Sequence, residues 1–353
     1  MLNLRRNKPV LLGVDISNTS VKVVELAQTA DGLDLRGYAI VPLPATENLS
    51  REESRIQIIG TAVRKAVKQT GTRLTHAVTA VPSAAVILKM VTFPASLGED
   101  DIEAQVELEA EQYIPYPLDE VSLDFSVLGP SDTLPGVVDV EVVASRKEYV
   151  EDRAAGLEWA GLKAEIVDVE SFAMERACQR VLEQEIALRG NEVYAISDMG
   201  ATTTALIVIR DRQVIFTREQ AFGGRQLTEE VQKRFGLLYD DAERAKKIGG
   251  LPDSYDREVR VSFISALGQQ IERSLHFFQS AQPQFKLKRL LLAGGCAALK
   301  GVAENFEETE DVRVLTADPF IGMSISPRAN RANLLQDAPA LLTATGLALR
   351  SFE

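Results

Sequence analysis

Two segments of the sequence place an aspartate at the end of an apolar run, just before a turn of small and hydroxylated residues. In the first, the residues between Asp15 and Lys22 include Ser17, Asn18 and Thr19. If Asn18-Thr19 forms a two-residue hairpin turn, Asp15 lies opposite Lys22 on one face. The turn can then bind phosphate oxygens, and the carboxylate can hold Mg²⁺ through water. Taken alone, an ordinary surface hairpin with a cross-strand ion pair is the simpler interpretation.

The second segment repeats this arrangement further along the chain, with Asp198 at the end of the apolar run. The small and hydroxylated residues that follow are Gly200, Ala201, Thr202 and Thr203. Two such tips that face each other would enclose a polyphosphate, with Asp15 and Asp198 on either side of a metal ion. A matched pair is much stronger evidence than either segment alone, so we expect a Mg²⁺-nucleotide site between them.

A third segment runs from an apolar stretch, Leu290–Ala293, into Gly294, Gly295 and Cys296. Glycines allow the backbone to approach a ligand closely at the carboxyl end of a strand, where α/β proteins bind nucleotides. By itself, a tight strand-to-helix turn is the simpler interpretation of this segment.

The elements that must position these segments follow a repeated plan. Each half contains a meander of three runs rich in β-branched residues, and in the first half a helical pattern over residues 52–70 follows the meander. The runs are 11–17, 21–27 and 35–41 in the first half, and 194–199, 202–209 and 214–217 in the second. This spacing is far longer than a solenoid repeat and indicates a duplicated domain with two lobes that face each other.

Residues 83–166 separate the two meanders and are predicted to form an inserted α+β subdomain with a proline-rich joint, Ile114-Pro115-Tyr116-Pro117. The strands expected here are 86–93, 121–128, 137–144 and 163–167, and the expected helices are 100–112 and 146–160. The elements expected after the insert are a long helix over 170–188, a mostly helical region over 226–282, a strand over 290–293 and a final helix over 338–350.

The composition excludes several classes of function. A length of 353 residues favours two lobes, and a net charge of −12 disfavours nonspecific binding to nucleic acid or anionic lipid. Cys178 and Cys296 lie far apart, which fits a reducing compartment and therefore the cytoplasm. The chain has only two histidines, His76 and His276, which disfavours histidine-based zinc sites and Ser-His triads. No apolar stretch is long enough to cross a membrane, so we expect membrane association only through a partner.

The order of hairpin, hairpin and Gly-Gly strand end resembles the superfamily of actin, FtsA and the heat-shock-chaperone ATPases, which share a duplicated α/β fold of ribonuclease H type. The early insert is more similar to FtsA than to actin. The closer resemblance is to the PilM family of type IV pilus assembly proteins, and it extends over essentially the whole chain. The segments that carry it are 11–17 with 21–26, 111–117, 222–230, 337–340 and 346–352.

The resemblance implies a division of the chain into subdomains. The first-lobe core comprises residues 1–82, with a returning helix at 167–190 and a final helix at 336–353, and the insert comprises 83–166. The second-lobe core comprises 191–224 and 286–335, and its helical subdomain comprises 225–285.

The resemblance also implies that the site binds ATP and Mg²⁺, with Asp15 and Asp198 orienting the metal ion. The residues expected to contact ATP are Ser17, Asn18, Thr19, Lys22, Gly200, Ala201, Thr202, Thr203, Gly223, Gly224, Glu243, Lys246, Gly294, Gly295 and Cys296. Many relatives have glycine where Ser17 stands. Glu170 falls where actin-like enzymes orient a water, although a carboxylate at a helix N-terminus is the simpler role. Hydrolysis therefore stays open, and slow turnover or none is expected.

In function, the resemblance implies a cytoplasmic adaptor of the type IV pilus inner-membrane platform. Such proteins bind the cytoplasmic N-terminal tail of the membrane protein PilN between the first-lobe core and the insert, near Ile114–Pro117, and further platform or motor components are expected partners. One alternative is a filament-forming ATPase of FtsA type, although no amphipathic targeting tail follows Phe352. Another is a small-molecule kinase of the same fold, for which the sequence shows no substrate pocket.

Overall fold

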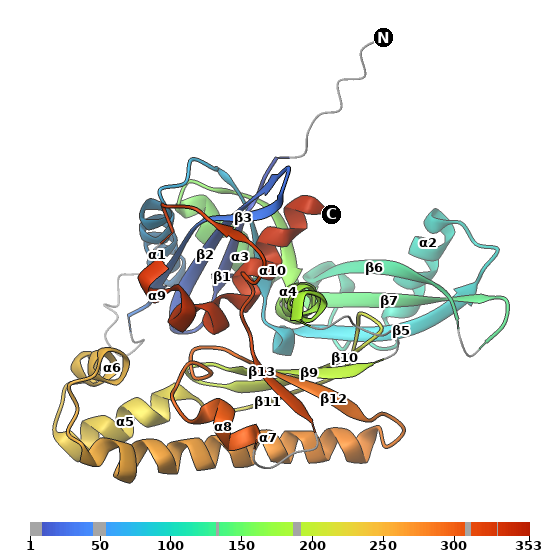
Figure 1. Cartoon of the computed structure of the whole chain (residues 1–353). Coiled ribbons are helices and arrows are strands. Elements are labelled where there is room, and N and C mark those ends of the chain that lie inside the picture. The colour runs from blue at the N-terminus through green and yellow to red at the C-terminus, as the bar shows by residue number, and fades with distance from the viewer. Residues whose placement is uncertain (1–8, 45–53, 132–133, 186–191, 308–311, 330) are drawn as a thin grey trace.

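The structure of the chain is a computed structural model that describes residues 9–44, 54–131, 134–185, 192–307, 312–329 and 331–353. Its two lobes lie one above the other in Figure 1, and the insert extends to one side of them. Helix α4 (Glu170–Glu185) lies between the two lobes.

The first-lobe sheet has six strands in the order β14-β3-β2-β1-β4-β8. The strands are β1 (Leu12–Ile16), β2 (Ser20–Thr29), β3 (Gly32–Pro42), β4 (His76–Val81), β8 (Lys163–Val169) and β14 (Ser324–Ile325). Alternate residues of β1 face opposite sides, as the strand period requires. Leu12, Val14 and Ile16 pack with helices α1 (Arg55–Thr70) and α3 (Lys147–Trp159).

On its other side this sheet packs against α10 (Leu342–Leu349) and α4. The approach of α10 is so close that a Cβ on Gly13 of β1 would lie 2.0 Å from the carbonyl oxygen of Ala344. Gly346 of α10 faces α4 equally closely, since a Cβ there would lie 1.7 Å from the carbonyl oxygen of Ala173. Glycine at these two positions is therefore what lets β1, α10 and α4 stack.

The second-lobe sheet has five strands in the order β11-β10-β9-β12-β13. The strands are β9 (Val193–Met199), β10 (Thr204–Arg210), β11 (Gln213–Gln220), β12 (Leu287–Ala293) and β13 (Arg313–Thr316). This is the order β3-β2-β1-β4-β8 of the first lobe, with an antiparallel meander followed by two parallel strands in both sheets. The duplicated actin-like α/β fold expected from the sequence is confirmed.

Helices cover one face of the second-lobe sheet and form its largest hydrophobic core. They are α5 (Gly224–Phe235), α6 (Tyr239–Ile248), a π-helical turn (Asp256–Arg260) that continues into α7 (Val261–Ala281), and the short α8 (Val302–Glu307). The mostly helical region expected over 226–282 is thereby confirmed. On the other face, Met174, Cys178 and Leu182 of α4 pack against β9.

The insert is built on a three-stranded sheet in the order β5-β7-β6. Its elements are β5 (Val86–Pro94), α2 (Glu99–Ala110), β6 (Val121–Pro130) and β7 (Val137–Arg146), with one-turn 3-10 helices at Ser83–Ala85 and Leu118–Glu120. The sequence placed residues 147–166 in the insert as well, but the structure differs. β8 pairs in parallel with β4, and α3 packs on α1. Both belong to the first-lobe layers, because strand pattern alone does not tell which sheet a strand joins.

The end of the chain also differs from the expected single helix over 338–350. Pro339 lies in a 3-10 turn, Ala338–Leu341, and a second 3-10 turn, Arg350–Phe352, follows α10. The short α9 (Arg331–Asp337) precedes them. The expected helix over 170–188 is confirmed as far as Glu185, and its last residues lie outside the described part of the chain. Within that part, no helix is long and apolar enough to cross a membrane.

Candidate functional site

The first hairpin has the register expected from its turn. Asp15 of β1 pairs with Lys22 of β2, and the Ser17 N–H donates to the carbonyl oxygen of Ser20 over 3.0 Å. The two side chains on this face meet directly, with Lys22 Nζ 2.7 Å from Asp15 Oδ2. Burial opposes the charged form of Lys22, but the charge and the hydrogen bond of Asp15 raise the pKa of its ammonium group overall.

The Ser17 side chain folds back into the hairpin tip. Its Oγ accepts from the backbone N–H groups of Thr19 over 3.4 Å and Ser20 over 3.1 Å. It also donates to the Ser20 carbonyl oxygen over 3.0 Å. The hydroxyl thus occupies two backbone donors at a tip where the sequence predicted phosphate contacts. Asn18 at the apex is exposed.

The second hairpin carries Asp198 at the end of β9, paired with Ala205 of β10 and Ala293 of β12. Its tip is a four-residue loop rather than the Gly-Ala turn expected, because β10 starts at Thr204 and the Gly200 N–H donates to the Thr203 carbonyl oxygen over 2.9 Å.

The two tips interact across the lobes. Burial raises the pKa of Asp198 to about 6, Lys22 opposes the shift, and Asp15 adds to it. Asp15 and Asp198 are therefore near enough to interact electrostatically across the lobes, and their role at a metal ion stays a prediction.

Glu170 joins this group from the first residue of α4, directly after β8. Burial raises its carboxyl pKa to about 8, and repulsion from Asp15 and Asp198 adds to this shift, while Arg153 and Lys22 oppose it. Three carboxylates and two cations therefore interact electrostatically between the lobes; Asp15 and Arg153 are buried, and the other three are partly buried. The sequence singled out four of these five residues and missed Arg153.

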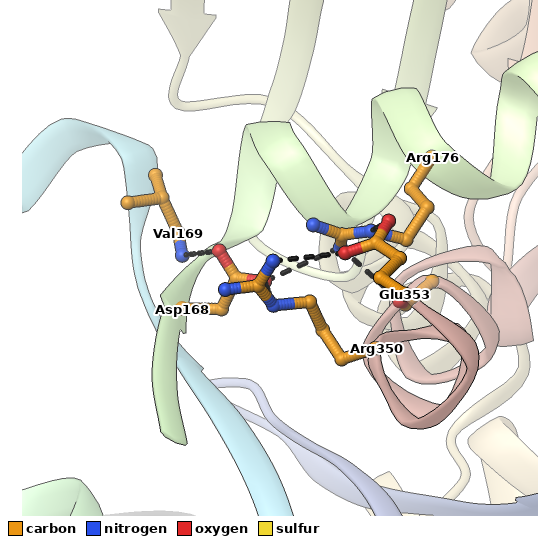
Figure 2. Close-up of polar contacts among 6 residues, drawn as sticks. Asp168, Val169, Arg176, Arg350 and Glu353 are labelled. Atoms are coloured by element: carbon orange, nitrogen blue, oxygen red, sulfur yellow. Dashed lines mark hydrogen bonds and ion pairs between the residues drawn. The ribbon is translucent and has the colours of Figure 1, made fainter. Parts of the chain in front are cut away.

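A network of charged side chains fixes the junction between β8 and α4 (Figure 2). Asp168 Oδ1 accepts from the Val169 N–H over 2.8 Å, and its Oδ2 lies 3.2 Å from Arg176 Nη1 and 3.6 Å from Arg350 Nε. Glu353 joins the two arginines, at 2.6 Å from Arg176 Nε and 2.8 Å from Arg350 Nη1. Because Glu170 follows two residues after Asp168, the network also orients the backbone that carries it.

Three loops of the second lobe are hydrogen-bonded into one surface next to Asp198. The Gly224 N–H donates to the Gly200 carbonyl oxygen over 3.0 Å, and the Cys296 N–H donates to that of Met199 over 3.0 Å. Cys296 Sγ also lies 3.4 Å from the Gly200 carbonyl oxygen. Gly294 is required here, since its φ is +83° and a Cβ would lie 2.4 Å from the Met199 carbonyl oxygen. The glycine segments that the sequence predicted as ligand contacts thus adjoin one another.

Glu243 and Lys246 of α6 complete this surface. Glu243 Oε2 accepts from Lys246 Nζ over 2.7 Å and from the Thr228 hydroxyl over 2.6 Å. The same hydroxyl accepts from Lys246 Nζ over 2.7 Å, and the Gly224 carbonyl oxygen, 3.0 Å away, is the alternative acceptor for its single hydrogen. Sequence reasoning missed Thr228, although it belongs to the segment Gly-Gly-Arg-Gln-Leu-Thr, and it links the glycine loop to both charged residues.

Among the described residues, no three histidine, cysteine, aspartate or glutamate side chains form a ready metal cage. A magnesium ion bound with nucleotide needs no such cage, because it keeps several waters and takes one or two carboxylates plus phosphate oxygens. Asp15 and Asp198, one from each lobe, are the two carboxylates for which the sequence predicts this role.

Comparison with known proteins identifies the family. The sequence model described as "Type IV pilus assembly protein PilM" matches residues 13–352. The chain belongs to the PilM family. A solved relative described as a PilM-PilN type IV pilus biogenesis complex shares 28% identity at a TM-score of 0.78, over 98% of this chain and 99% of that one. The expected family is therefore confirmed, and the chain is an actin-like protein of type IV pilus assembly.

More distant relatives share the fold. The cell division protein FtsA of Bacillus subtilis (strain 168) is 21% identical over 264 residues, which cover 68% of this PilM-family chain and 58% of FtsA. The chain thus spans little more than half of that relative. Ta0583, an archaeal actin homologue solved in complex with ADP, has 14% identity and a TM-score of 0.51 over 97% of this chain and 99% of that one. At this identity the likeness shows the fold.

Proposed function

We propose that this PilM-family protein binds Mg·ATP between its two hairpin tips and acts as a cytoplasmic adaptor of the type IV pilus inner-membrane platform. The observation that carries the proposal is the interaction of Asp15 and Lys22 from the first lobe with Asp198 from the second. Two lobes that direct opposite charges to one place, beside loops of glycine and hydroxyl residues, suit a metal-bound polyphosphate.

The carboxylates themselves support a cation in this place. Asp198 and Glu170 both have raised carboxyl pKa values, caused first by burial and also by neighbouring carboxylates. A divalent ion held by Asp15 and Asp198 would remove much of this repulsion. Lys22 would then be available to the phosphates, and Glu243 and Lys246 would contact the nucleoside. Glu170 is protonated near neutral pH without the ion and makes a poor base, so slow turnover or none is expected.

The solved PilM-PilN complex supports the proposed partner, the cytoplasmic N-terminal tail of PilN. In the present chain the proline-rich joint of the insert combines a buried anchor, Ile114, with Tyr116, whose side chain is 43% exposed. Arg146 stacks on the Tyr116 ring at 5.5 Å. An extended tail bound there would let the protein associate with a membrane without a spanning helix of its own.

The test of nucleotide binding is titration calorimetry with Mg·ATP on the wild type, Asp15→Asn and Asp198→Asn. We expect each variant to lose about tenfold or more in affinity, because each removes a charge-assisted contact worth about 1.5–3 kcal/mol. Asp211→Asn is the matched control, since Asp211 lies in the β10-β11 turn with a φ of +51° that asparagine tolerates. If the wild type binds no nucleotide, or the three variants behave alike, the proposal fails.

A further inference from the structure

Arg153 is a buried cation that the sequence patterns do not explain. It lies on α3, is only 9% exposed, and donates from Nε to the carbonyl oxygen of Ala80 over 3.0 Å. Burial lowers the pKa of its guanidinium group, which shows that this position is unfavourable for a charge. A buried arginine is kept where a partner anion compensates for the lost solvation.

Ala80, which accepts the hydrogen bond of Arg153, lies in β4. The neighbouring strands, β1 and β8, lead to the first-lobe site residues Asp15 and Glu170. β4 lies between β1 and β8 in the sheet. Gly13 of β1 pairs with Val78 of β4, so two residues further on Asp15 is level with Ala80. On the other side Ala80 pairs with Asp168, and Glu170 follows at the end of β8. Arg153 is therefore held at the edge of the sheet that Asp15 and Glu170 share.

Most of the hydrogen-bonding capacity of Arg153 is unused. Its Nε–H bonds to Ala80, and within the described part of the chain the structure gives its two Nη groups neither an ion pair nor a hydrogen bond. Glu170 and Asp15 attract the guanidinium without a direct bond to it. Two coplanar Nη groups that make no other hydrogen bond can donate together to two oxygens of a phosphate.

Electrostatic interactions also order the residues along the site. Arg153 interacts with Glu170 and Asp15, Lys22 interacts with Asp15 and Asp198, and Cys296 interacts with Asp198, Lys246 and Glu243. Arg153 thus interacts with carboxylates of the first lobe, whereas the Glu243–Lys246 pair belongs to the second lobe. If that pair contacts the nucleoside, the phosphate that reaches Arg153 is the last of the chain.

We propose that Arg153 binds the terminal phosphate of the nucleoside triphosphate through its Nη groups and thereby makes the site distinguish ATP from ADP. The inference rests on the proposed nucleotide binding and goes beyond it, because it assigns the discrimination to one residue. A diphosphate retains the contacts near Asp198 and in the second lobe but does not extend to the guanidinium.

The experiment compares the affinities of Mg·ATP and Mg·ADP, by calorimetry, for the wild type, Arg153→Gln, Arg153→Lys and Arg64→Gln. We expect Arg153→Gln to weaken ATP binding by about 10- to 100-fold and ADP binding by less than about threefold. Arg153→Lys should fall between, since one ammonium group keeps the charge but not the paired geometry. Arg64 on α1 is an exposed matched control that stacks on Trp159, and its variant should leave both affinities unchanged.

The outcomes separate the two proposals. If the wild type binds neither nucleotide, the proposed function itself fails. If the wild type binds both and Arg153→Gln weakens them equally or not at all, nucleotide binding stands and the role of Arg153 is overturned. Thermal melts report whether each variant folds. Should Arg153→Gln not fold, Arg153→Lys decides, since a ratio of ATP to ADP affinity equal to that of the wild type would refute the inference.

Discussion

The hydroxyl of Ser17 competes for the same backbone donors that a phosphate would use. It accepts from the N–H groups of Thr19 and Ser20 at the first hairpin tip. A glycine at this position would leave both donors open. The side chain therefore stabilises the hairpin tip at the expense of ligand contacts.

We predict that Ser17→Ala strengthens Mg·ATP binding at least about fivefold, since two freed N–H groups, each worth about 0.5–1.5 kcal/mol to a new acceptor, together supply about 1 kcal/mol or more. Calorimetry on Ser17→Ala and Ser17→Gly separates the hydroxyl from the Cβ. Thr29→Ala is a control, because Thr29 makes a similar bond to the Gly32 carbonyl oxygen in another turn. Weaker binding in both Ser17 variants would contradict the prediction.

Glu175 illustrates a different residue-scale effect, on stability. It lies on α4 between the lobes, and its buried Oε1 has no hydrogen-bond partner. Burial raises its carboxyl pKa from 4.5 to about 7, while Arg212 and Arg176 oppose the shift. The folded state therefore binds this proton more tightly than the unfolded state, so the stabilisation is complete below pH 4.5 and is lost as the pH rises through 7.

The glutamine of Glu175→Gln cannot titrate. We therefore predict that the unfolding free energy of Glu175→Gln, relative to that of the wild type, increases between pH 5 and pH 8. The shift corresponds to at most about 3 kcal/mol. Urea unfolding of both proteins at several pH values measures this difference, and the titration of other groups cancels in the comparison. Glu183→Gln, an exposed position on the same helix, should show no such trend. A difference that is constant with pH would rule the prediction out.

At the scale of elements, the stack of β1, α10 and α4 depends on small residues. Gly346→Ala should destabilise the fold by about 1–3 kcal/mol or more, because the added Cβ meets the Ala173 carbonyl oxygen at 1.7 Å and the helices must separate. Denaturant unfolding measures the loss. Gly98→Ala is the control, since the nearest atom to its added Cβ is Asp101 Oδ2 at 3.8 Å. Equal losses in the two variants would show that the contact matters little.

The elements show what the sequence could and could not predict. The Asn18-Thr19 turn predicted the register that sets Asp15 opposite Lys22, because a two-residue hairpin leaves no freedom of pairing. Alternation located most strands but not their partners, so β8 was assigned to the insert although it pairs with β4. Arg153 was missed for the same reason, since its proximity to Glu170 depends on how α3 packs on the sheet and not on any local spacing.

At the scale of the whole molecule, the proposed ligand and the proposed partner bind at different parts of the chain. The Arg153 bond to Ala80 joins α3 to β4. In the chain, β4 directly precedes the insert and α3 directly follows it. A nucleotide that engages Arg153 would act on the base of the insert. Binding at the hairpin tips would in this way alter the proline-rich joint at which we propose that the PilN tail binds.

We therefore predict that Mg·ATP raises the affinity for a PilN tail peptide at least about fivefold, the lower end of usual coupling free energies. Titration of the peptide with and without Mg·ATP measures the effect. By reciprocity, saturating peptide must raise the affinity for Mg·ATP by the same factor. Asp198→Asn should abolish the difference while keeping the basal peptide affinity. Equal peptide affinities with and without nucleotide would contradict the predicted coupling between the two binding sites.

The attachment of the insert has a practical consequence. Val86 lies opposite Ser145 in the β5-β7 pair, and the Ser145 hydroxyl donates to the Ala85 carbonyl oxygen over 3.0 Å. The chain therefore leaves the first lobe and returns to it at neighbouring points. Residues 86–146 could be excised and the gap bridged by a short turn, with every strand of both lobe sheets intact. A protein shortened in this way would keep Asp15 and Asp198 in their lobes but would lack the proline-rich joint of the insert. Another small domain could be joined to the first lobe at the same two points.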